Sequence, residues 1–452
     1  MGATEPLYTA AEMRAAEERY PGYPDTIPEL MERAGAATAD AALRLFPDAR
    51  RWAVVCGGGS NGGDGRVAAR LLERAGREVR VVDAKAGGHD LGEPDAIVDA
   101  LFGTGFSGEP RAGAAALIEA INAAGAPVLA LDLPSGVDAS TGEVAGAAVE
   151  AAATVTFHGR KVGLAVAPGR FHAGEVHVAD IGLEQAETEH ALVGPEILAE
   201  VPRRGARDNK YTAGHVLVVG GSPGMTGAPS LTARAALRAD AGYVTIAAPA
   251  ETLPVLETLV VEAVKRPLEQ AFDAAAKAGA LALGPGLGRG SEAIRLVRRA
   301  LSELELPAVV DADALFELEP ADWPAARVLT PHEGELARLL GRESLEVAAH
   351  RLAAARDAAE RFRCVVLLKG ADTLVAAPGG SVLVVALGLP SLATAGTGDV
   401  LTGVVAAFLA KGMEPQRAAA AAAAAQQLAS HRAPRHGLVA GDLLDALPHV
   451  LG

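Results

Sequence analysis

Two glycine-rich loops, each set between a strand-like run and a helix-like run, most constrain the fold of this 452-residue chain. The first loop, CGGGSNGGDG, covers residues 56–65, and the second, AGTGDVLTG, covers residues 395–403. At such a junction the backbone N–H groups that open the helix point toward a bound anion. The sequence therefore predicts two phosphate-binding sites. Neither loop ends in the Gly-Lys-Ser/Thr of a P-loop, which argues against an ordinary P-loop NTPase.

The residues around the first loop carry more information than its glycine spacing, because 52 of the 452 residues are Gly. RWAVVC at 51–56 is typical of a buried strand, and RVAARLLERAG at 66–76 is typical of a helix. The next strand-like run, 78–84, contains Asp83, which could meet a ribose hydroxyl. Together these segments predict a βαβ nucleotide-binding unit.

Composition excludes several classes of function. The net charge of -15 argues against electrostatic binding of nucleic acid or of an anionic membrane. The sequence contains no signal-peptide pattern and no charge-free apolar run long enough to span a bilayer, so we expect a cytoplasmic protein. Cys56 and Cys364 lie in apolar strand-like runs, which predicts buried, reduced thiols and neither a disulfide framework nor a metal site.

Strand-like and helix-like runs alternate in both halves of the chain, which predicts two α/β domains with mainly parallel sheets. Ligand sites are then expected at the C-terminal ends of the strands. The rhythm is lost between residues 189 and 209, so we place a first domain at 1–200 and a second at 205–452. The alanine run at 418–425 predicts a helix of small residues packed closely on a sheet.

Nine motifs in order resemble a known pair of domains. GGGSNGGDGRVAAR, VDALFGTGFSG, LDLPSGVDASTG and ATVTFHGRKVGL resemble the NAD(P)H-hydrate epimerase domain. NKYTAGHVLVVGGSPGMTGA, LGPGLG, LTPHEGE, LLKGADT and AGTGDVLTG resemble the ADP-dependent NAD(P)H-hydrate dehydratase, a member of the ribokinase-like superfamily. The resemblance covers nearly the whole chain. It implies two three-layer α/β/α domains, Rossmann-like at the N-terminus and ribokinase-like at the C-terminus.

The resemblance also implies an activity in metabolite repair. The substrates would be NADHX and NADPHX, the hydrated forms of NADH and NADPH. The first domain would interconvert the R and S epimers, and the second would dehydrate the S epimer at the expense of ADP with Mg²⁺, whose ligands the sequence does not assign. The other partners we expect are further copies of this chain in a homo-oligomer.

In the epimerase half, the resemblance assigns proton handling to Asp132 and K⁺ binding to Asn61, Asp99 and Ser135. Lys161 could approach this site, although we favour a surface lysine that extends from a loop. The family usually has Asn where this chain has Ser60; we expect substrate binding to survive, and loss of epimerase activity stays open. The expected substrate-binding residues are Ser60, Asn61, Gly62, Gly63, Asp64, Gly103, Thr104, Gly105, Phe106, Ser107, Gly108, Glu109 and Asp132.

In the dehydratase half, the resemblance implies that Asp399 activates the hydroxyl group of the hydrate for phosphorylation, after which phosphate leaves by elimination. A carboxylate beside a glycine-rich helix start suits that task. A zinc site at His332 is disfavoured, because no second His or Cys stands at ligand spacing. The expected hydrate-binding residues are Ala228, Gly286, Gly288, His332 and Asp399, and the expected nucleotide-binding residues are Lys369, Gly370, Ala371, Asp372, Thr373 and Gly398.

Three other functions stay open at this stage. The first half could be an NAD-dependent oxidoreductase domain, although Asp64 puts a carboxylate where a Rossmann loop would meet pyrophosphate. The first half could also be a binding or regulatory module without catalysis. The second half could be a sugar or vitamin kinase that leaves its product phosphorylated.

Overall fold

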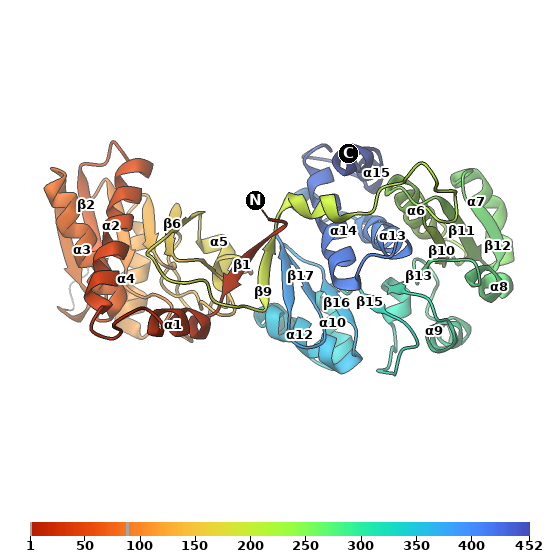
Figure 1. Ribbon diagram of the computed structural model, residues 1–452, viewed down its shortest axis with the longest axis horizontal. Coiled ribbons are helices and arrows are strands. Elements are labelled where there is room, and N and C mark those ends of the chain that lie inside the picture. The colour runs from red at the N-terminus through yellow and green to blue at the C-terminus, as the bar shows by residue number, and fades with distance from the viewer. Residues whose placement is uncertain (1, 87–89) are drawn as a thin grey trace. The chain divides into compact units, whose positions relative to one another are not determined.

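The computed structural model describes residues 2–86 and 90–452, which fall into two compact units (Figure 1). The N-terminal unit contains residues 6–190, and the C-terminal unit contains residues 191–452 together with residues 2–5. Both units are α/β with mainly parallel sheets, as predicted.

The described residues of the N-terminal unit form a six-stranded parallel sheet in the order β3-β2-β4-β5-β6-β8. Residues on β2 alternate between its faces: Trp52 and Val54 pack with α2 and α3, whereas Val55 packs with Ile118 and Ile121 of α4. This alternation produces the three α/β/α layers that we predicted. The elements are β1 (Thr4–Tyr8), α1 (Ala10–Glu18), α2 (Ile27–Leu45), β2 (Arg51–Cys56), α3 (Ser60–Arg74), β3 (Glu78–Asp83), β4 (Ala96–Ala100), α4 (Ala112–Ala123), β5 (Val128–Leu131), β6 (Ala153–Phe157), β7 (Arg160–Lys161), α5 (Gly169–His172) and β8 (Glu175–Ala179).

The C-terminal unit is built on a parallel run of strands, β12-β11-β10-β13-β14-β15-β16, which is followed by antiparallel β17 and β18. Helices α6, α13, α14 and α15 share one hydrophobic core with this sheet (Figure 1). The strands are β9 (His190–Val193), β10 (His215–Val219), β11 (Tyr243–Ala248), β12 (Val264–Pro267), β13 (Ala280–Leu283), β14 (Ala308–Val310), β15 (Arg327–Leu329), β16 (Val365–Leu368), β17 (Thr373–Ala376) and β18 (Val382–Val385). The helices are α6 (Gly227–Arg238), α7 (Leu253–Leu259), α8 (Ala271–Ala275), α9 (Ser291–Glu303), α10 (Glu333–Leu340), α11 (Ser344–Ala349), α12 (Arg351–Phe362), α13 (Thr397–Ala410), α14 (Pro415–Ser430) and α15 (Ala440–Leu451).

Helix α14 contains the alanine run, and the structure confirms the prediction for it. Residues 418–425 are each at most 1% exposed and lie in the core with the sheet and with α13. Because alanine side chains are short, the helix approaches its neighbours closely.

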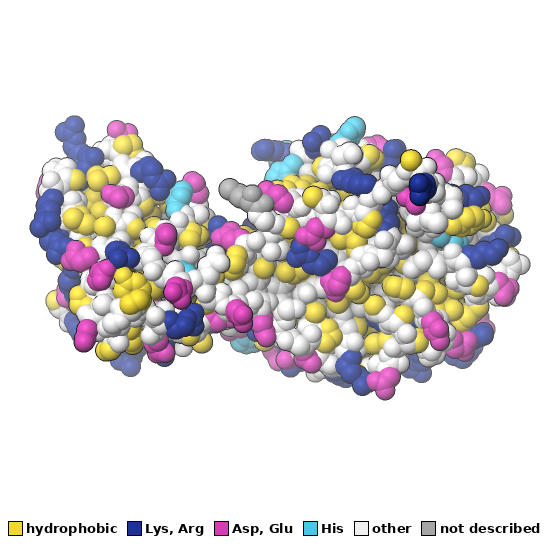
Figure 2. Space-filling model, viewed as in Figure 1, with side chains coloured by type: hydrophobic (Ala, Val, Ile, Leu, Met, Phe, Trp, Pro, Cys, Tyr) yellow, Lys and Arg dark blue, Asp and Glu magenta, His cyan; other side chains and the backbone are white. Residues whose placement is uncertain are grey.

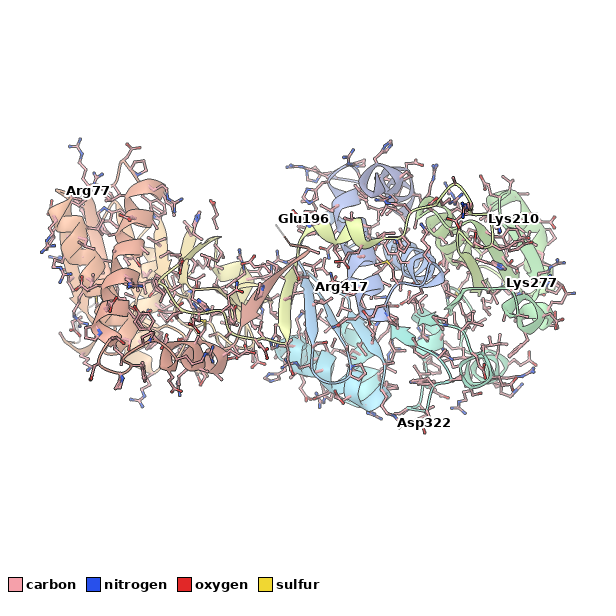
Figure 3. The ribbon with its side chains drawn as sticks, in the orientation of Figure 1. Arg77, Glu196, Lys210, Lys277, Asp322 and Arg417 are labelled. Carbon is pink, nitrogen blue, oxygen red and sulfur yellow. The ribbon has the colours of Figure 1, made fainter. Side chains whose placement is uncertain are left out.

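The segment just after residue 190 belongs to the C-terminal unit, so the structural division lies before residue 200, where we had ended the first domain. The reason is local packing. The 3-10 helix Pro195–Glu200 lies against α14, and Figure 3 labels one residue of each, Glu196 and Arg417. Glu200 Oε2 accepts a hydrogen bond from Arg417 Nε at 2.9 Å. Ile197 and Leu198 are buried in the same core as α14.

The remaining sequence expectations concern the charged side chains on the surface, membrane-spanning helices and the two cysteines. Acidic and basic side chains are interspersed over the visible face of each unit (Figure 2). Among residues 2–86 and 90–452, no helix combines the length and the apolar character needed to cross a membrane. Cys56 and Cys364 are free and buried, as predicted.

Candidate active sites

The first glycine-rich loop makes a close turn between β2 and α3. A Cβ atom on Gly57 would lie 2.0 Å from the carbonyl oxygen of Leu101, and one on Gly62 would lie 2.0 Å from that of Gly57. Only glycine fits such contacts. The loop therefore lies directly against the end of β4 and places the start of α3 beside it.

A cavity of about 580 Å³ opens at this loop. One part of its wall is polar and comes from the ends of β2, β4, β5 and β6. The other part is apolar and comes mainly from α1 and α2. The predicted residues in the wall are Ser60, Asn61, Asp64, Gly103, Thr104, Gly105, Phe106 and Asp132, and the apolar residues include Met13, Ile27, Leu30, Met31, Phe157 and Ile181.

Five predicted substrate-binding residues do not line this cavity. Gly62 and Gly63 are inside α3, where Gly62 packs against Gly57 and a side chain on Gly63 would meet Met31. Ser107, Gly108 and Glu109 follow the four lining residues of their loop and lie outside the wall. The loop contributes to the cavity through its first half.

Asp132 is held in the cavity wall at the end of β5. Its backbone has a φ of 70°, a left-handed conformation that aspartate tolerates better than most residues. Its Oδ1 lies 2.6 Å from Lys161 Nζ and accepts a hydrogen bond from Thr156, and its Oδ2 accepts one from the N–H of Thr104. The carboxylate therefore faces the cavity with a fixed orientation.

Lys161 is a buried member of this site, so our preference for a surface lysine is wrong. Its side chain is 1% exposed, and besides Asp132 its ammonium donates to Thr156 Oγ1 at 2.9 Å and to the carbonyl of Phe157 at 2.8 Å. Burial of the charge is acceptable because three acceptors surround it. The motif HGRKVG did not reveal this, since the partners come from β5 and β6.

Two further carboxyl groups line the same cavity. Burial, followed by the charges of Asp132 and Glu17, raises the pKa of Asp64 to about 8. Burial and the charge of Asp132 also raise the pKa of Glu17, a residue of α1 that the motifs did not single out. At neutral pH the cavity thus combines a proton-bearing carboxyl with an ion-paired carboxylate.

Of the three residues predicted to hold K⁺, Asp99 and Ser135 are hydrogen-bonded to each other, and Asn61 lies near Asp132. Asp99 Oδ1 accepts a hydrogen bond from Ser135 Oγ at 2.7 Å, and Ser135 Oγ lies 3.5 Å from the carbonyl oxygen of Phe102. A Cβ atom on Gly103 would lie 2.8 Å from Asn61 Oδ1 and 3.2 Å from Asp132 Oδ2. This donor set of buried carboxylate, hydroxyl, amide and carbonyl oxygens fits a hard monovalent cation.

Asp83, the residue that motivated the oxidoreductase hypothesis, lies outside the cavity wall. Its carboxylate pairs with Arg66 of α3 at 2.6 Å and accepts a hydrogen bond from the N–H of Lys85. Asp83 therefore stabilises the loop through these two contacts, and among residues 2–86 and 90–452 it is not one of those that line the cavity.

In the C-terminal unit, Asp399 lies in the first turn of α13, directly after the glycine-rich turn. Gly396 has a φ of 87°, which glycine adopts without strain, and Thr232 of α6 donates a hydrogen bond to the backbone carbonyl of Asp399 at 3.1 Å. Burial, followed by the charge of Asp311, raises the pKa of Asp399 to about 7. Such a carboxylate is suited to accept a proton near neutral pH.

Asp311 is a member of this site that the sequence motifs did not single out. It follows β14, is 2% exposed, and contacts Lys369 Nζ at 2.9 Å through Oδ1 and Thr402 Oγ1 at 2.8 Å through Oδ2. A Cβ on Gly398 would lie 3.5 Å from Lys369 Nζ and 3.9 Å from Asp311 Oδ2. The signal was present in AVVDADAL, where an acid follows a buried strand.

Four of the predicted nucleotide-binding residues, Lys369, Gly370, Ala371 and Asp372, form the loop between β16 and β17, whereas Thr373 begins β17 and Gly398 lies in the first turn of α13. Burial alone would lower the pKa of Lys369, but the carboxylates of Asp311 and Glu335 outweigh it and raise that pKa. Arg351 is 5% exposed, forms an ion pair with Glu333, and donates to the backbone carbonyl of Asp372 at 2.8 Å. The motifs HEGE and KGADT are therefore connected through one buried arginine.

The predicted hydrate-binding residues other than Asp399 follow three strands of the same sheet: Ala228 lies in the first turn of α6 after β10, Gly286 and Gly288 follow β13, and His332 follows β15. A Cβ on Gly286 would lie 3.3 Å from Ala228 Cβ, so these two positions are adjacent. Gly288 donates its N–H to Asp313 at 2.9 Å. His332 is the N-cap of α10, where Nδ1 accepts from the N–H of Gly334.

Within residues 2–86 and 90–452, no group of three or more His, Cys, Asp and Glu side chains is arranged to hold a metal ion. The carboxylates of Asp311 and Glu335 lie 2.9 and 3.9 Å from Lys369 Nζ, and carboxylate oxygens of this kind could bind a nucleotide-associated Mg²⁺.

Family profiles match both units. Residues 216–450 match the profile described as NAD(P)H-hydrate dehydratase, and residues 28–88 and 83–163 match that of the YjeF-related protein N-terminus. The chain is 39% identical to the bifunctional NAD(P)H-hydrate repair enzyme of Moorella thermoacetica, over 98% of this chain and 96% of that protein. The chain belongs to this family of bifunctional repair enzymes. The protein with the same description from Escherichia coli is 36% identical over 94% of this chain and 90% of its own length.

Solved structures support the same assignment for the C-terminal unit. The ADP/ATP-dependent NAD(P)H-hydrate dehydratase of Bacillus subtilis, co-crystallised with ATP and Mg²⁺, is 30% identical, with a TM-score of 0.52 over 57% of this chain and 96% of its own. A ribokinase-like superfamily protein of Enterococcus faecalis, 22% identical, has a TM-score of 0.52 over 59% of this chain and 97% of its own. The predicted ribokinase-like fold is confirmed, as is the predicted membership of the repair-enzyme family.

Proposed function

We propose that this chain repairs hydrated NADH and NADPH, epimerising the R and S hydrates at the N-terminal cavity and dehydrating the S hydrate, at the expense of ADP, beside Asp399. The observation that carries the proposal is the pair of acid–base centres at two separate glycine-rich helix starts. Asp132 with Lys161 stands at one, and Asp399 with Asp311 and Lys369 stands at the other. Full-length similarity to bifunctional repair enzymes supports it.

In the N-terminal cavity, the N–H groups at the start of α3 face the space where substrate phosphates would bind, and the apolar wall formed by α1 and α2 can cover the nicotinamide ring. Asp132 accepts the proton of the ring hydroxyl as the bond between the hydroxyl-bearing carbon and the ring nitrogen opens to an aldehyde, and it returns the proton when the nitrogen closes the ring on the opposite face, which inverts the configuration. Lys161 pairs with Asp132 and holds its carboxylate in place. A bound K⁺, held by Asn61, Asp99 and Ser135, would supply positive charge beside the substrate.

At the second site, Asp399 accepts the proton of the ring hydroxyl as the hydroxyl oxygen of the hydrate attacks the terminal phosphorus of ADP. AMP leaves, with Lys369 and the N–H groups of the turn around Gly398 stabilising the negative charge. The phosphorylated hydrate then loses phosphate from one carbon and a proton from the next, which restores the ring double bond. Mg²⁺ bound to the nucleotide would neutralise phosphate charge during the transfer.

The test is recovery of reduced-nicotinamide absorbance from a mixture of both hydrate epimers with ADP and Mg²⁺. We expect full recovery by the wild-type chain, none with Asp399→Ala, and fast recovery of the S epimer alone with Asp132→Ala. A phosphorylated hydrate that persists would instead support the kinase hypothesis. No recovery with either ADP or ATP would refute the proposal.

Several finer points stay predictions. Ser60 lies in the cavity wall, so we expect substrate binding to survive although the family usually has asparagine there; loss of epimerase activity stays open. A homo-oligomeric assembly, a cytoplasmic location and the preference for ADP also stay predictions from the sequence. Sedimentation of the purified chain would test the first of them.

A further inference from the structure

Two adjacent glutamines near the end of α14 contact two different segments of the dehydratase site. Gln426 Nε2 donates a hydrogen bond to the backbone carbonyl of Thr397 at 2.5 Å. Gln427 Nε2 donates to Thr373 Oγ1 at 3.2 Å, and its Oε1 accepts from the N–H of Leu387 at 2.6 Å. Both side chains are at least nine-tenths buried, with exposures of 7% and 5%. None of the motifs in the sequence included them.

The two contacted segments have different tasks in the proposed reaction. Thr397 opens the first turn of α13, directly before Gly398 and the proposed base Asp399. Thr373 ends the loop that begins at Lys369 and is proposed to bind the nucleotide. Consecutive residues of a helix point about 100° apart, so the two amides reach two segments from one rigid element.

Helix α14 is well suited to act as a fixed reference for both segments. Its alanine run is fully packed against the sheet and α13, and close packing resists displacement. The side chain of Gln427 also packs closely against Gly388, since a Cβ on Gly388 would lie 2.9 Å from Gln427 Cγ. The amide groups therefore have little freedom to move relative to the sheet.

We propose that Gln426 and Gln427 are separate positioning residues of the dehydratase: Gln427 holds the nucleotide loop, and Gln426 holds the turn that carries Asp399. This inference rests on the proposed function of the same site. Gln427 then contributes to the affinity for the nucleotide, and Gln426 contributes to the rate of phosphoryl transfer. A purely structural role would make the two residues equivalent, since they share a helix and a degree of burial.

The experiment compares three methionine variants, because methionine keeps the length of glutamine without its hydrogen bonds. Gln426→Met and Gln427→Met remove the two contacts separately. Gln416→Met is the matched control: Gln416 lies on the same helix and donates to the carbonyls of Val375 and Ser381, at 3.0 and 3.1 Å, within the β17–β18 hairpin. For each variant, kcat and KM for ADP are measured with the S hydrate, together with the melting temperature and the calorimetric Kd for ADP.

We expect Gln427→Met to raise KM and Kd for ADP about tenfold while kcat changes less than about twofold. We expect Gln426→Met to lower kcat about tenfold and to leave KM and Kd nearly unchanged, because small displacements of a catalytic group cost rate rather than affinity. Gln416→Met should lower the melting temperature without either kinetic effect.

The inference is overturned if Gln426→Met and Gln427→Met change kcat and KM in the same proportion, or if both behave like Gln416→Met. Failure of the proposed function has a different signature, namely a wild-type chain that restores no reduced nicotinamide. In that case the ADP titrations still decide the inference: weaker binding in Gln427→Met alone supports it, and equal binding in all variants overturns it.

Discussion

Replacement of Lys161 by methionine should destabilise the N-terminal unit more than any surface substitution does. The side chains of Lys161 and Asp132 are 1% and 10% exposed, and their charged atoms lie 2.6 Å apart. Without the ammonium, the carboxylate of Asp132 stays buried beside Thr104 and Thr156, which donate only neutral hydrogen bonds. Loss of one partner of a buried ion pair typically costs about 3–5 kcal/mol.

The two remaining hydrogen bonds to Asp132 place the expected loss at the lower end, about 3 kcal/mol. Divided by a urea slope of about 2–3 kcal/mol per molar, this loss corresponds to a fall in the urea midpoint of about 1–1.5 M. The double variant Lys161→Met/Asp132→Asn should regain most of the stability, because no uncompensated charge then remains buried. Asparagine also tolerates the positive φ of 70° at this position.

Tryptophan fluorescence can report on this unit by itself. The chain has two tryptophans, Trp52 in the N-terminal unit and Trp323 in the C-terminal unit. In a Trp323→Phe background, the buried Trp52 follows the unfolding of the N-terminal unit alone. A midpoint shift below about 0.3 M in urea, or no recovery in the double variant, would refute the charge-compensation argument.

Three further results are expected. The kcat/KM of dehydration should fall as the pH drops below about 7, because Asp399 must be ionised to accept a proton and its pKa is raised to about 7; a flat profile from about pH 5 to about pH 8 would contradict this. Gly62→Ala should lower the stability of the N-terminal unit by about 2 kcal/mol or more, since its Cβ would lie 2.0 Å from a backbone oxygen, whereas Gly113→Ala in α4, with no atom within 4 Å of its Cβ, should not lower the urea midpoint. Arg351→Leu should raise KM for ADP in steady-state assays, because the nucleotide loop loses the hydrogen bond to the carbonyl of Asp372. An unchanged KM would show that this arginine does not contribute to nucleotide binding.

Local patterns predicted the larger part of the fold and the principal site segments. The glycine-rich loops lie where the sequence placed them, each at the start of a helix, because their glycines make contacts that a Cβ would prevent. Asp132 lies at the end of strand β5, and Asp399 lies in the first turn of helix α13. The alanine run forms a buried helix, as its composition indicated.

The missed residues share one property: their roles depend on partners that are distant in sequence. Asp311 bonds to Lys369 and Thr402, which lie 58 and 91 residues away. Lys161 looked like a loop lysine because its partner Asp132 comes from another strand. The domain boundary also depends on a contact that is distant in sequence: the structural division lies near residue 190 because Glu200 packs with Arg417 of α14.

The sequence alone determined where the backbone turns tightly, which runs alternate between strand and helix, and which family the chain resembles, since all of these depend on residue types at short spacing. Only the tertiary structure decided which charges are buried together and which side chains hold the site loops in place. The physical reason is that burial and pairing set the free energy of a charge or an amide. Both depend on strand order and helix packing, as Lys161 beside Asp132 and Gln426 beside Thr397 illustrate.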